Sequence, residues 1–467
     1  MMKRGAGILH AISTLGSEAY EFVDFLAEAG QSYWQVLPIG PVGKTLSPYQ
    51  SSSAFAGNPS LIDREAISRA PELYAPQGEG YLRFLEKNAS WIHDFALYVA
   101  VHASQRKKPL SLWPEELRNP SEKTLRRLHQ THKHAIDLVL HEQYCFFVQW
   151  LSLRRYANHK GIQFIGDLPI YVFEDSAEFW LRRDIFDVDC YGRPASTAGV
   201  PPDAFSANGQ QWNNPVYAWD KNPEGVFSFW RERLLQASQL YNGVRIDHFR
   251  AFADYYAIPY ASRPSDSRPS DSRQTSQVLR PPDLHKGKWR LGPGRAFTDM
   301  IQAEFPSLLV IAEDLGILSK TAKTLMKECG LPGMRVLQFA FDGNLKNPHL
   351  PHNVVENSVC YTGTHDNNTL VGWIRSMSRE ERRVAMEYLG VTQAAGLQEA
   401  LLAAALMSKA RITIIPIQDW LGLGAVARIN KPGTVGRRNW KWRLPKDTLN
   451  SELALHICFV TRDLCNR

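Results

Sequence analysis

Eight short apolar segments recur along the chain, and most of them end in polar or acidic residues. In chain order they read GAGILH, SYWQVLPIG, IQFIGDLPI, GVRIDHF, LLVIAEDLG, MRVLQFAFD, SVCYTGTHDN and ITIIPIQD. Near-continuous apolar strands of this length are typical of a parallel sheet that is covered on both faces. Helical patterns separate most of the segments. Eight strands alternating with helices predict the α/β class and a closed (β/α)8 TIM barrel.

The clearest helical pattern is SEAYEFVDFLAEAG, residues 17–30. Its apolar residues recur at helical spacing and share one face. They are Phe22, Val23, Phe25, Leu26 and Ala29. We expect Ser17 to cap the start of this helix and Gly30 to end it. KTAKTLMKECG repeats the pattern, with Gly330 as its stop.

We expect residues 1–467 to form a single barrel with two insertions. About 120 residues separate the second and third strands, and the insertion at about 60–160 is rich in helical and aromatic patterns. The second insertion, at about 260–280 between the fourth and fifth strands, contains a Ser-Arg-Pro-Ser-Asp repeat with no apolar residue to bury. It is predicted to be a mobile surface loop. No separate C-terminal β-domain is expected. Trp440 and Trp442 near the end are interpreted as packing against the barrel.

Composition excludes several classes of protein. No apolar run approaches the roughly 18 residues of a membrane helix.

The six cysteines are scattered without a close pair of metal-ligand type, which favours reduced thiols and a cytoplasmic location. A net charge of +7 permits a nucleic-acid partner, but the basic residues are spread along the chain except at Arg437 and Arg438. A solvated basic surface is the simpler interpretation, so neither a nucleic acid nor a membrane is expected as a partner.

Acidic residues stand where several of the predicted strands end. Asp167 ends the third segment, Asp247 the fourth, and Glu313 with Asp314 the fifth, while Asp342 follows the sixth and His365 with Asp366 ends the seventh. Active sites of this barrel type lie at the carboxyl ends of the strands, so these side chains should converge on one mouth. A single strand-end Asp often caps a helix or holds a turn. Several carboxylates together, with Arg245 and His365 adjacent, are better explained by one site.

Three carboxylates without a cysteine or histidine cluster suit the chemistry of glycosidic bonds. One attacks the anomeric carbon, a second delivers a proton to the leaving oxygen, and a third favours the positive charge that develops on the ring. Arg245 lies two residues before Asp247 and can keep it ionised, whereas crowded like charges and burial should raise the pKa of Glu313. Such a reaction requires neither a metal nor an organic cofactor.

Nine motifs relate the chain to a known family. They are FLAEAGQSYWQVLPIGP, SPYQSSSAFAGNP, GDLPIYV, AGVPPDAFSANGQQWNNPVY, VRIDHFRAF, IAEDLG, GMRVLQFAF, YTGTHDNNT and PGTVGRRNW. In these motifs the sequence resembles the 4-alpha-glucanotransferases, also called amylomaltases or disproportionating enzymes, which are related to the alpha-amylases. The resemblance runs from Arg4 almost to NWKWRL.

This resemblance implies a role for each position that matches a motif. The catalytic positions are Asp247 as the nucleophile, Glu313 as the general acid/base and Asp366 as the stabiliser of the transition state. Eight further positions are implied to bind the sugar or support the site. They are Arg245 and His365, which hold the nucleophile and a sugar hydroxyl; Asp167, which supports the site; Tyr49 and Trp212, aromatic contacts to the glucan; and Ser47, Gln210 and Asp342, contacts to sugar hydroxyls.

The activity implied by the resemblance is the transfer of α-1,4-glucan segments. The donor is a maltooligosaccharide or a starch- or glycogen-derived glucan, and the acceptor is the 4-hydroxyl of glucose or a short maltodextrin. The reaction is a retaining double displacement through a covalent glucosyl-enzyme, with GVPPDAFSANGQQW on the acceptor side. Two alternatives stay open: an α-glucan hydrolase of the same superfamily, and a catalytically inactive glucan-binding protein.

Overall fold

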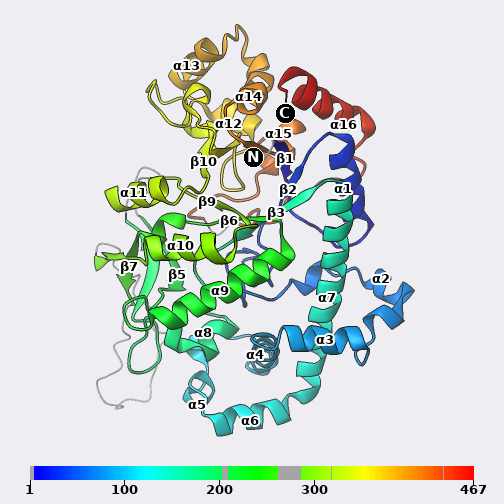
Figure 1. The fold of residues 1–467 in the computed structure, drawn as a ribbon, viewed down its shortest axis with the longest axis vertical. Coiled ribbons are helices and arrows are strands. Elements are labelled where there is room, and N and C mark those ends of the chain that lie inside the picture. The colour runs from blue at the N-terminus through cyan, green and yellow to red at the C-terminus, as the bar shows by residue number, and fades with distance from the viewer. Residues whose placement is uncertain (1–4, 202–208, 261–285, 317, 435, 467) are drawn as a thin grey trace.

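The computed structural model describes residues 5–201, 209–260, 286–316, 318–434 and 436–466. Eight parallel strands close into a barrel in which each strand pairs with its neighbours in chain order and β12 pairs with β1 (Figure 1). These strands are β1 Gly5–Leu9, β2 Tyr33–Gln35, β3 Gln163–Leu168, β6 Gly243–Ile246, β9 Leu309–Ala312, β10 Gly333–Val336, β11 Ser358–Tyr361 and β12 Ile412–Pro416. The predicted (β/α)8 barrel is confirmed, and each predicted segment supplies one strand.

Apolar side chains from the strands form a buried cluster within the barrel. They include Leu9, Ile165, Ile311, Met334, Val336, Val359, Tyr361, Ile412 and Ile414. Burial of this apolar area is the main term that favours closure of the sheet. Charged residues gather where the strands end, so the barrel is a packed core with a polar mouth.

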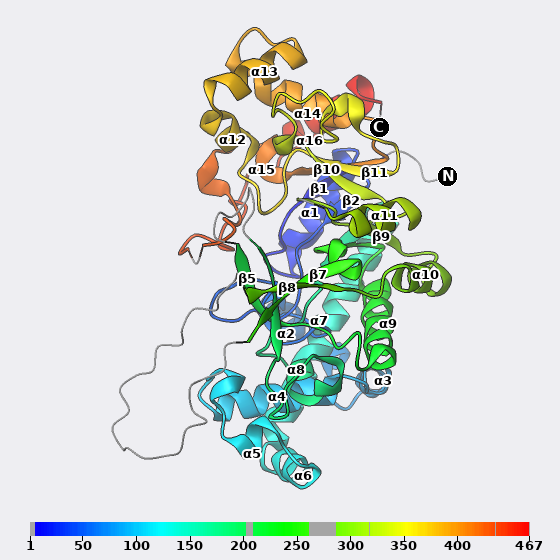
Figure 2. The same cartoon turned by 90° about the vertical axis from the view of Figure 1, so that its left-hand side faces the viewer.

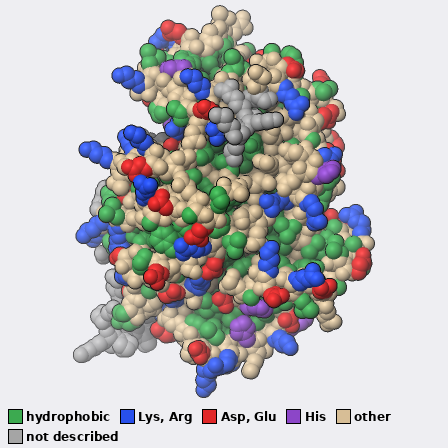
Figure 3. All heavy atoms as spheres, viewed as in Figure 1, with side chains coloured by type: hydrophobic (Ala, Val, Ile, Leu, Met, Phe, Trp, Pro, Cys, Tyr) green, Lys and Arg blue, Asp and Glu red, His purple; other side chains and the backbone are tan. Residues whose placement is uncertain are grey.

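Helices alternate with the strands and cover the barrel. They are α1 Ser17–Glu28, α8 Ala177–Leu181, α9 Pro223–Leu240, α10 Arg295–Glu304, α11 Lys320–Glu328, α12 Leu370–Ser376, α13 Arg379–Leu389 and α14 Leu397–Met407. The described residues after β12 form helices α15 Ile417–Trp420 and α16 Ser451–Cys458, and no strand. On the face drawn in Figure 3, Lys and Arg side chains are interspersed with Asp and Glu.

Helix α1 matches its predicted face and end but not its predicted cap. Phe22, Val23, Phe25 and Leu26 are buried, and Gly30 follows the helix with φ of 66°. The prediction for Ser17 is wrong, because Gly16 occupies the N-cap position and Ser17 is already the first residue of the helix.

Six α-helices lie between β2 and β3. They are α2 Arg64–Arg69, α3 Glu79–Lys87, α4 Ile92–Ser104, α5 Glu115–Arg118, α6 Glu122–Thr131 and α7 Lys133–His159. Figures 1 and 2 show α4, α5 and α6 at the end of the molecule opposite α12 and α13. Helix α7 joins this segment to the barrel, since the buried ring of Trp150 packs at a tilt against Phe164 of β3, with centroids 5.0 Å apart, and its indole N–H donates to the carbonyl of Leu240 at 3.0 Å.

A second sheet, which was not predicted, stands beside the barrel (Figure 2). Its antiparallel strands, in the order β5-β4-β7-β8, are β4 Ser196–Val200, β5 Gln210–Pro215, β7 Asp254–Pro259 and β8 Lys288–Leu291. Asp187 connects the inner strand β4 to the edge strand β8, because it accepts from Ser196 of β4 at 3.1 Å and pairs with Arg290 of β8 at 2.8 Å. The predicted mobile insertion at about 260–280 lies outside the described residues, apart from its first residue, Tyr260.

Within the described part of the chain, no single helix has the length and apolar character required to cross a membrane. Helix α13 and the helical residues Ala394–Met407 meet those requirements only together, as a pair bent by 71°.

Candidate active site

The site is built on a buried ion pair between neighbouring strands. Asp167 of β3 and Arg245 of β6 are register partners, so their side chains lie side by side at the carboxyl end of the barrel. Arg245 Nη1 donates to both carboxylate oxygens of Asp167, at 2.8 and 2.9 Å. The side chain of Arg245 is 5% exposed and that of Asp167 is 0% exposed. Burial of these charges is tolerated because they are paired and hydrogen-bonded.

Asp247 directly follows β6 and shares the same guanidinium. Its Oδ1 lies 3.0 Å from Arg245 Nη1, and its side chain is 30% exposed, so it faces the mouth. Burial raises the pKa of Asp247 above its usual range, while Arg245 opposes that shift. Arg245 therefore stabilises the ionised carboxylate, as predicted from the two-residue spacing, without fully cancelling the effect of burial.

Glu313 follows β9, and its carboxylate accepts two hydrogen bonds from the backbone. Its Oε2 accepts from the N–H of His248 at 2.7 Å and its Oε1 from the N–H of Leu315 at 2.8 Å. Burial, and then the charge of Asp247, raise the pKa of Glu313 to about 7 against the opposing effects of Arg245 and the two N–H groups. His248 adopts the left-handed conformation with φ of 48°, which is uncommon for a residue other than glycine and is typical of functional sites.

The two carboxylates differ in their distance from the shared cation. Arg245 lies 3.0 Å from Asp247 but 4.0 Å from Glu313, so it favours the charge on Asp247. Because two adjacent carboxylates resist double ionisation, the proton that the pair retains near neutral pH belongs on Glu313. This distribution suits a nucleophile beside a general acid.

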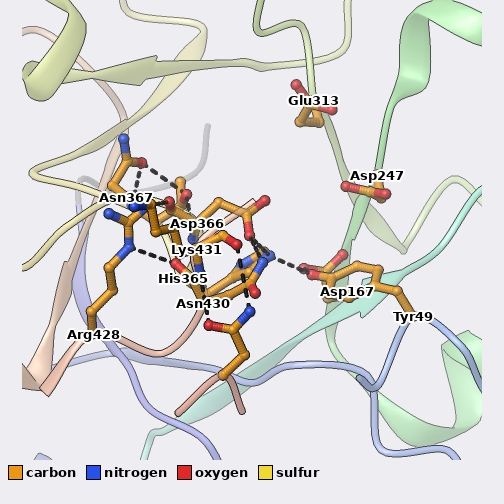
Figure 4. Close-up of polar contacts among 12 residues, drawn as sticks. Tyr49, Asp167, Asp247, Glu313, His365, Asp366, Asn367, Arg428, Asn430 and Lys431 are labelled. Carbon is orange, nitrogen blue, oxygen red and sulfur yellow. Dashed lines mark hydrogen bonds and ion pairs between the residues drawn. The ribbon is translucent and has the colours of Figure 1, made fainter. Parts of the chain in front are cut away.

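Across the mouth, a chain of hydrogen bonds connects β11 to the same ion pair. The Tyr49 hydroxyl donates to Asp167 Oδ2 at 2.7 Å and lies 3.0 Å from His365 Nε2. Tyr49 has a single O–H, which Asp167 already accepts, so His365 Nε2–H must be the donor in the second contact. The Tyr49 and His365 rings also stack, with centroids 5.2 Å apart. Figure 4 shows Asp247 and Glu313 at neighbouring strand ends, with His365 and Asp366 across from them.

Asp366 is the most exposed of the three carboxylates, at 45%. Its Oδ1 lies 3.5 Å from His365 Nε2 and accepts from Asn430 Nδ2 at 2.6 Å. Arg428 donates to the main-chain carbonyl of Asp366 at 2.5 Å. Sequence reasoning missed Asn430 and Arg428, because neither lies at the end of a predicted strand.

The antiparallel sheet brings two predicted sugar contacts to the mouth. Trp212 of β5 donates to Gln210 Oε1 at 3.2 Å, and its ring meets the edge of His248, with centroids 4.8 Å apart. Since His248 follows Asp247, the ring contact places Trp212 near the carboxylate pair, and Gln210 is hydrogen-bonded to Trp212. The proposed acceptor-side segment, residues 199–212, is described only at its two ends.

Ser47 and Asp342 take part in turns. Ser47 is half-buried, and its N–H donates to Thr45 Oγ1 at 3.4 Å. Asp342 is exposed and accepts from the N–H of Asn344 at 2.9 Å. Their contacts with sugar hydroxyls stay predictions.

The two C-terminal tryptophans have different positions. Trp442 packs on the barrel as predicted, with its ring centroid 6.2 Å from that of His10. Trp440 instead lies at the site, because its ring centroid is 5.8 Å from those of both Tyr49 and His365. Its backbone is left-handed, with φ of 66°. The alternation of the two residues in NWKWRL did not distinguish these environments.

One arginine offsets part of the negative charge of the mouth. Among the residues that the structure describes, no group of three or more His, Cys, Asp or Glu side chains could hold a metal ion. The guanidinium of Arg245 stands between the carboxylates of Asp167, Asp247 and Glu313, where it supplies the compensating positive charge.

Fold and site together define a class: a (β/α)8 barrel whose strand ends gather carboxylates, the residue type used in glycosidic-bond chemistry. The family model described as 4-alpha-glucanotransferase matches residues 9–77 and 72–449, so the chain belongs to that family.

Individual relatives cover nearly the whole chain. The 4-alpha-glucanotransferase of Thermus thermophilus is 39% identical over 486 residues, which span 95% of this chain and 93% of that protein. The chloroplastic/amyloplastic 4-alpha-glucanotransferase of Solanum tuberosum is 36% identical over 498 residues, covering 96% and 83%. The solved amylomaltase of Streptococcus agalactiae in complex with acarbose superimposes with a TM-score of 0.89 at 33% identity, covering 100% of each chain.

Proposed function

We propose that this protein is a 4-alpha-glucanotransferase that moves α-1,4-glucan segments from a donor glucan to the 4-hydroxyl of an acceptor sugar. One observation carries the proposal: Asp247 and Glu313 share the guanidinium of Arg245, yet the pKa of Glu313 rises to about 7. Such a pair holds an ionised nucleophile and a protonated acid at the same pH.

In the first step, an Asp247 oxygen attacks the anomeric carbon of the donor while Glu313 gives its proton to the departing glycosidic oxygen. The C–O bond to the leaving sugar breaks, and a covalent glucosyl ester with Asp247 forms. Asp366, across the mouth, supplies negative charge to the oxocarbenium-like transition state.

In the second step, Glu313 is a carboxylate and acts as the base. It removes the proton from the acceptor 4-hydroxyl, whose oxygen attacks the anomeric carbon and releases Asp247. Transfer exceeds hydrolysis when a bound sugar occupies the position that water would otherwise take. Trp212 offers a flat apolar face for that sugar beside His248.

Incubation with maltotriose tests this function. We expect a ladder of shorter and longer maltooligosaccharides together with glucose, measured by chromatography. A hydrolase would give only shorter products, and an inactive binding protein would leave maltotriose unchanged. Either of those results would contradict the proposal.

The pH dependence of kcat/KM should report the carboxylate pair. Above about pH 7, Glu313 loses the proton that the first step requires, so kcat/KM should fall as pH rises. On the acid side, kcat/KM should fall at a higher pH than an ordinary Asp would give, because the pKa of Asp247 is raised. A profile that stays flat well above pH 7 would contradict the assignment of Glu313.

We further propose that residues 1–467 act as one catalytic unit, in which the segment at about 60–160 shares a core with the barrel. The donors and acceptors are proposed to be maltooligosaccharides, longer α-1,4-glucans and glucose, with no nucleic acid or membrane as a partner. A cytoplasmic location is supported by the free thiols of Cys145, Cys190, Cys329 and Cys458, which suit a reducing compartment.

A further inference from the structure

The segment Arg428–Asn430 lies beside His365 and Asp366, in the loop that follows β11 (Figure 4). Asn430 contacts this loop twice. Its side-chain Nδ2 donates to Asp366 Oδ1 at 2.6 Å, and its backbone N–H donates to the carbonyl of His365 at 3.1 Å. The two contacts fix the amide relative to the carboxylate that it holds.

Arg428 completes the attachment without touching the carboxylate. Its Nη2 donates to the main-chain carbonyl of Asp366 at 2.5 Å, and its Nε donates to the carbonyl of Asn430 at 2.6 Å. The segment therefore holds both the backbone and the side chain of Asp366. Asp366 needs this support because its side chain is 45% exposed, whereas Asp247 and Glu313 are more enclosed and contact Arg245.

The type of donor is important at this position. An amide N–H orients a carboxylate while leaving its negative charge intact, whereas a guanidinium would largely neutralise it. Arg428 attracts Asp366 electrostatically, but it donates to the backbone carbonyl and not to the carboxylate. The carboxylate is therefore not bonded directly to a guanidinium, and its negative charge can still act on a developing cation in the mouth.

We propose that Asn430 is a positioning residue, which holds Asp366 in the orientation that stabilises the transition state. This inference rests on the proposed function, because it presupposes the role of Asp366 in glucan transfer. Asn430 acts through Asp366, so its loss should affect the rate of transfer more than the binding of the donor.

The first test replaces Asn430 by Ala in the full chain. Loss of a hydrogen bond to a charged group predicts a fall in kcat for maltotriose of about 10- to 100-fold, with little change in KM. The matched control is Asn357→Ala. It removes the hydrogen bond that the Asn357 side-chain amide donates to the carbonyl of Gly330 at 2.9 Å. This contact lies at the amino end of β11, away from the mouth, so the control should retain native kcat. Native kcat in Asn430→Ala would overturn the inference.

A second variant separates positioning from a loss of folding. Asn430→Asp places a carboxyl group against Asp366. When that pair holds a proton, the new group can still donate to Asp366, but when both groups are ionised they repel each other. We expect kcat relative to the native enzyme to recover as pH falls and to decline as pH rises. A deficit that is independent of pH would overturn the inference.

The outcomes distinguish this inference from the proposed function. If Asp247→Asn retains full transfer activity, the proposed site is wrong and the inference about Asn430 is overturned with it. If Asp247→Asn abolishes transfer while Asn430→Ala retains native kcat, only the inference fails.

Discussion

Replacement of Asp247 by Asn should lower kcat for maltotriose disproportionation by about 10⁴- to 10⁶-fold, the range seen when a covalent nucleophile is removed. The amide cannot form the glucosyl ester, yet it preserves the shape of a side chain that is 30% exposed. Arg245 keeps its bonds to Asp167, so the buried ion pair survives. Maltooligosaccharide affinity, measured by calorimetry, should remain close to native.

The control for this variant is Asp299→Asn. Asp299 lies on the exposed surface of α10 and pairs with Arg295 at 3.4 Å, and such a surface pair contributes little to stability. It should retain native kcat. If Asp247→Asn still redistributes maltotriose at a rate within tenfold of native, Asp247 is not the nucleophile.

Glu313→Gln should lower kcat by about 10²- to 10⁴-fold, the usual contribution of general acid–base catalysis. The amide cannot protonate the leaving sugar or deprotonate the acceptor, so both steps slow. A maltosyl fluoride donor separates them, because fluoride departs without a proton. The first step should recover with that donor and the second should not, which gives a burst followed by slow turnover in stopped-flow assays of fluoride release.

Glu304→Gln serves as the matched control, since Glu304 forms an exposed ion pair with Arg231 at 2.8 Å. It should show native rates with both donors. Equal losses on maltotriose and on the fluoride donor in Glu313→Gln would argue against a role for Glu313 in protonating the leaving group.

The barrel could be predicted because each of its strands is a short apolar run that ends in polar residues. The antiparallel sheet could not. Strand β5 reads QQWNNP, in which only Trp212 has high β-propensity. The sheet is also held by contacts between residues distant in sequence, such as that of Asp187 with Arg290. The cap of α1 was missed for a local reason: Ser17 and Gly16 both suit the start of a helix, and the chain uses Gly16.

The candidate site was predictable in part for the same topological reason. Side chains at the ends of parallel strands meet at one mouth, so the sequence alone predicts that Asp167, Arg245 and Asp247 lie together. The remaining contacts come from loops. The backbone N–H of His248 that holds Glu313 depends on a left-handed φ, and the approach of Trp440 to Tyr49 depends on the path of the C-terminal segment. No periodicity in the sequence encodes either of these.

The most direct test of the account is to trap the intermediate. Glu313→Gln is incubated with maltosyl fluoride, digested, and analysed by mass spectrometry. We expect a maltosyl adduct on the peptide that contains Asp247, and no adduct when Asp247→Asn is combined with Glu313→Gln. An adduct on a different peptide, or turnover of the donor without any covalent species on the enzyme, would contradict the assignment of Asp247 as the nucleophile of a retaining transferase.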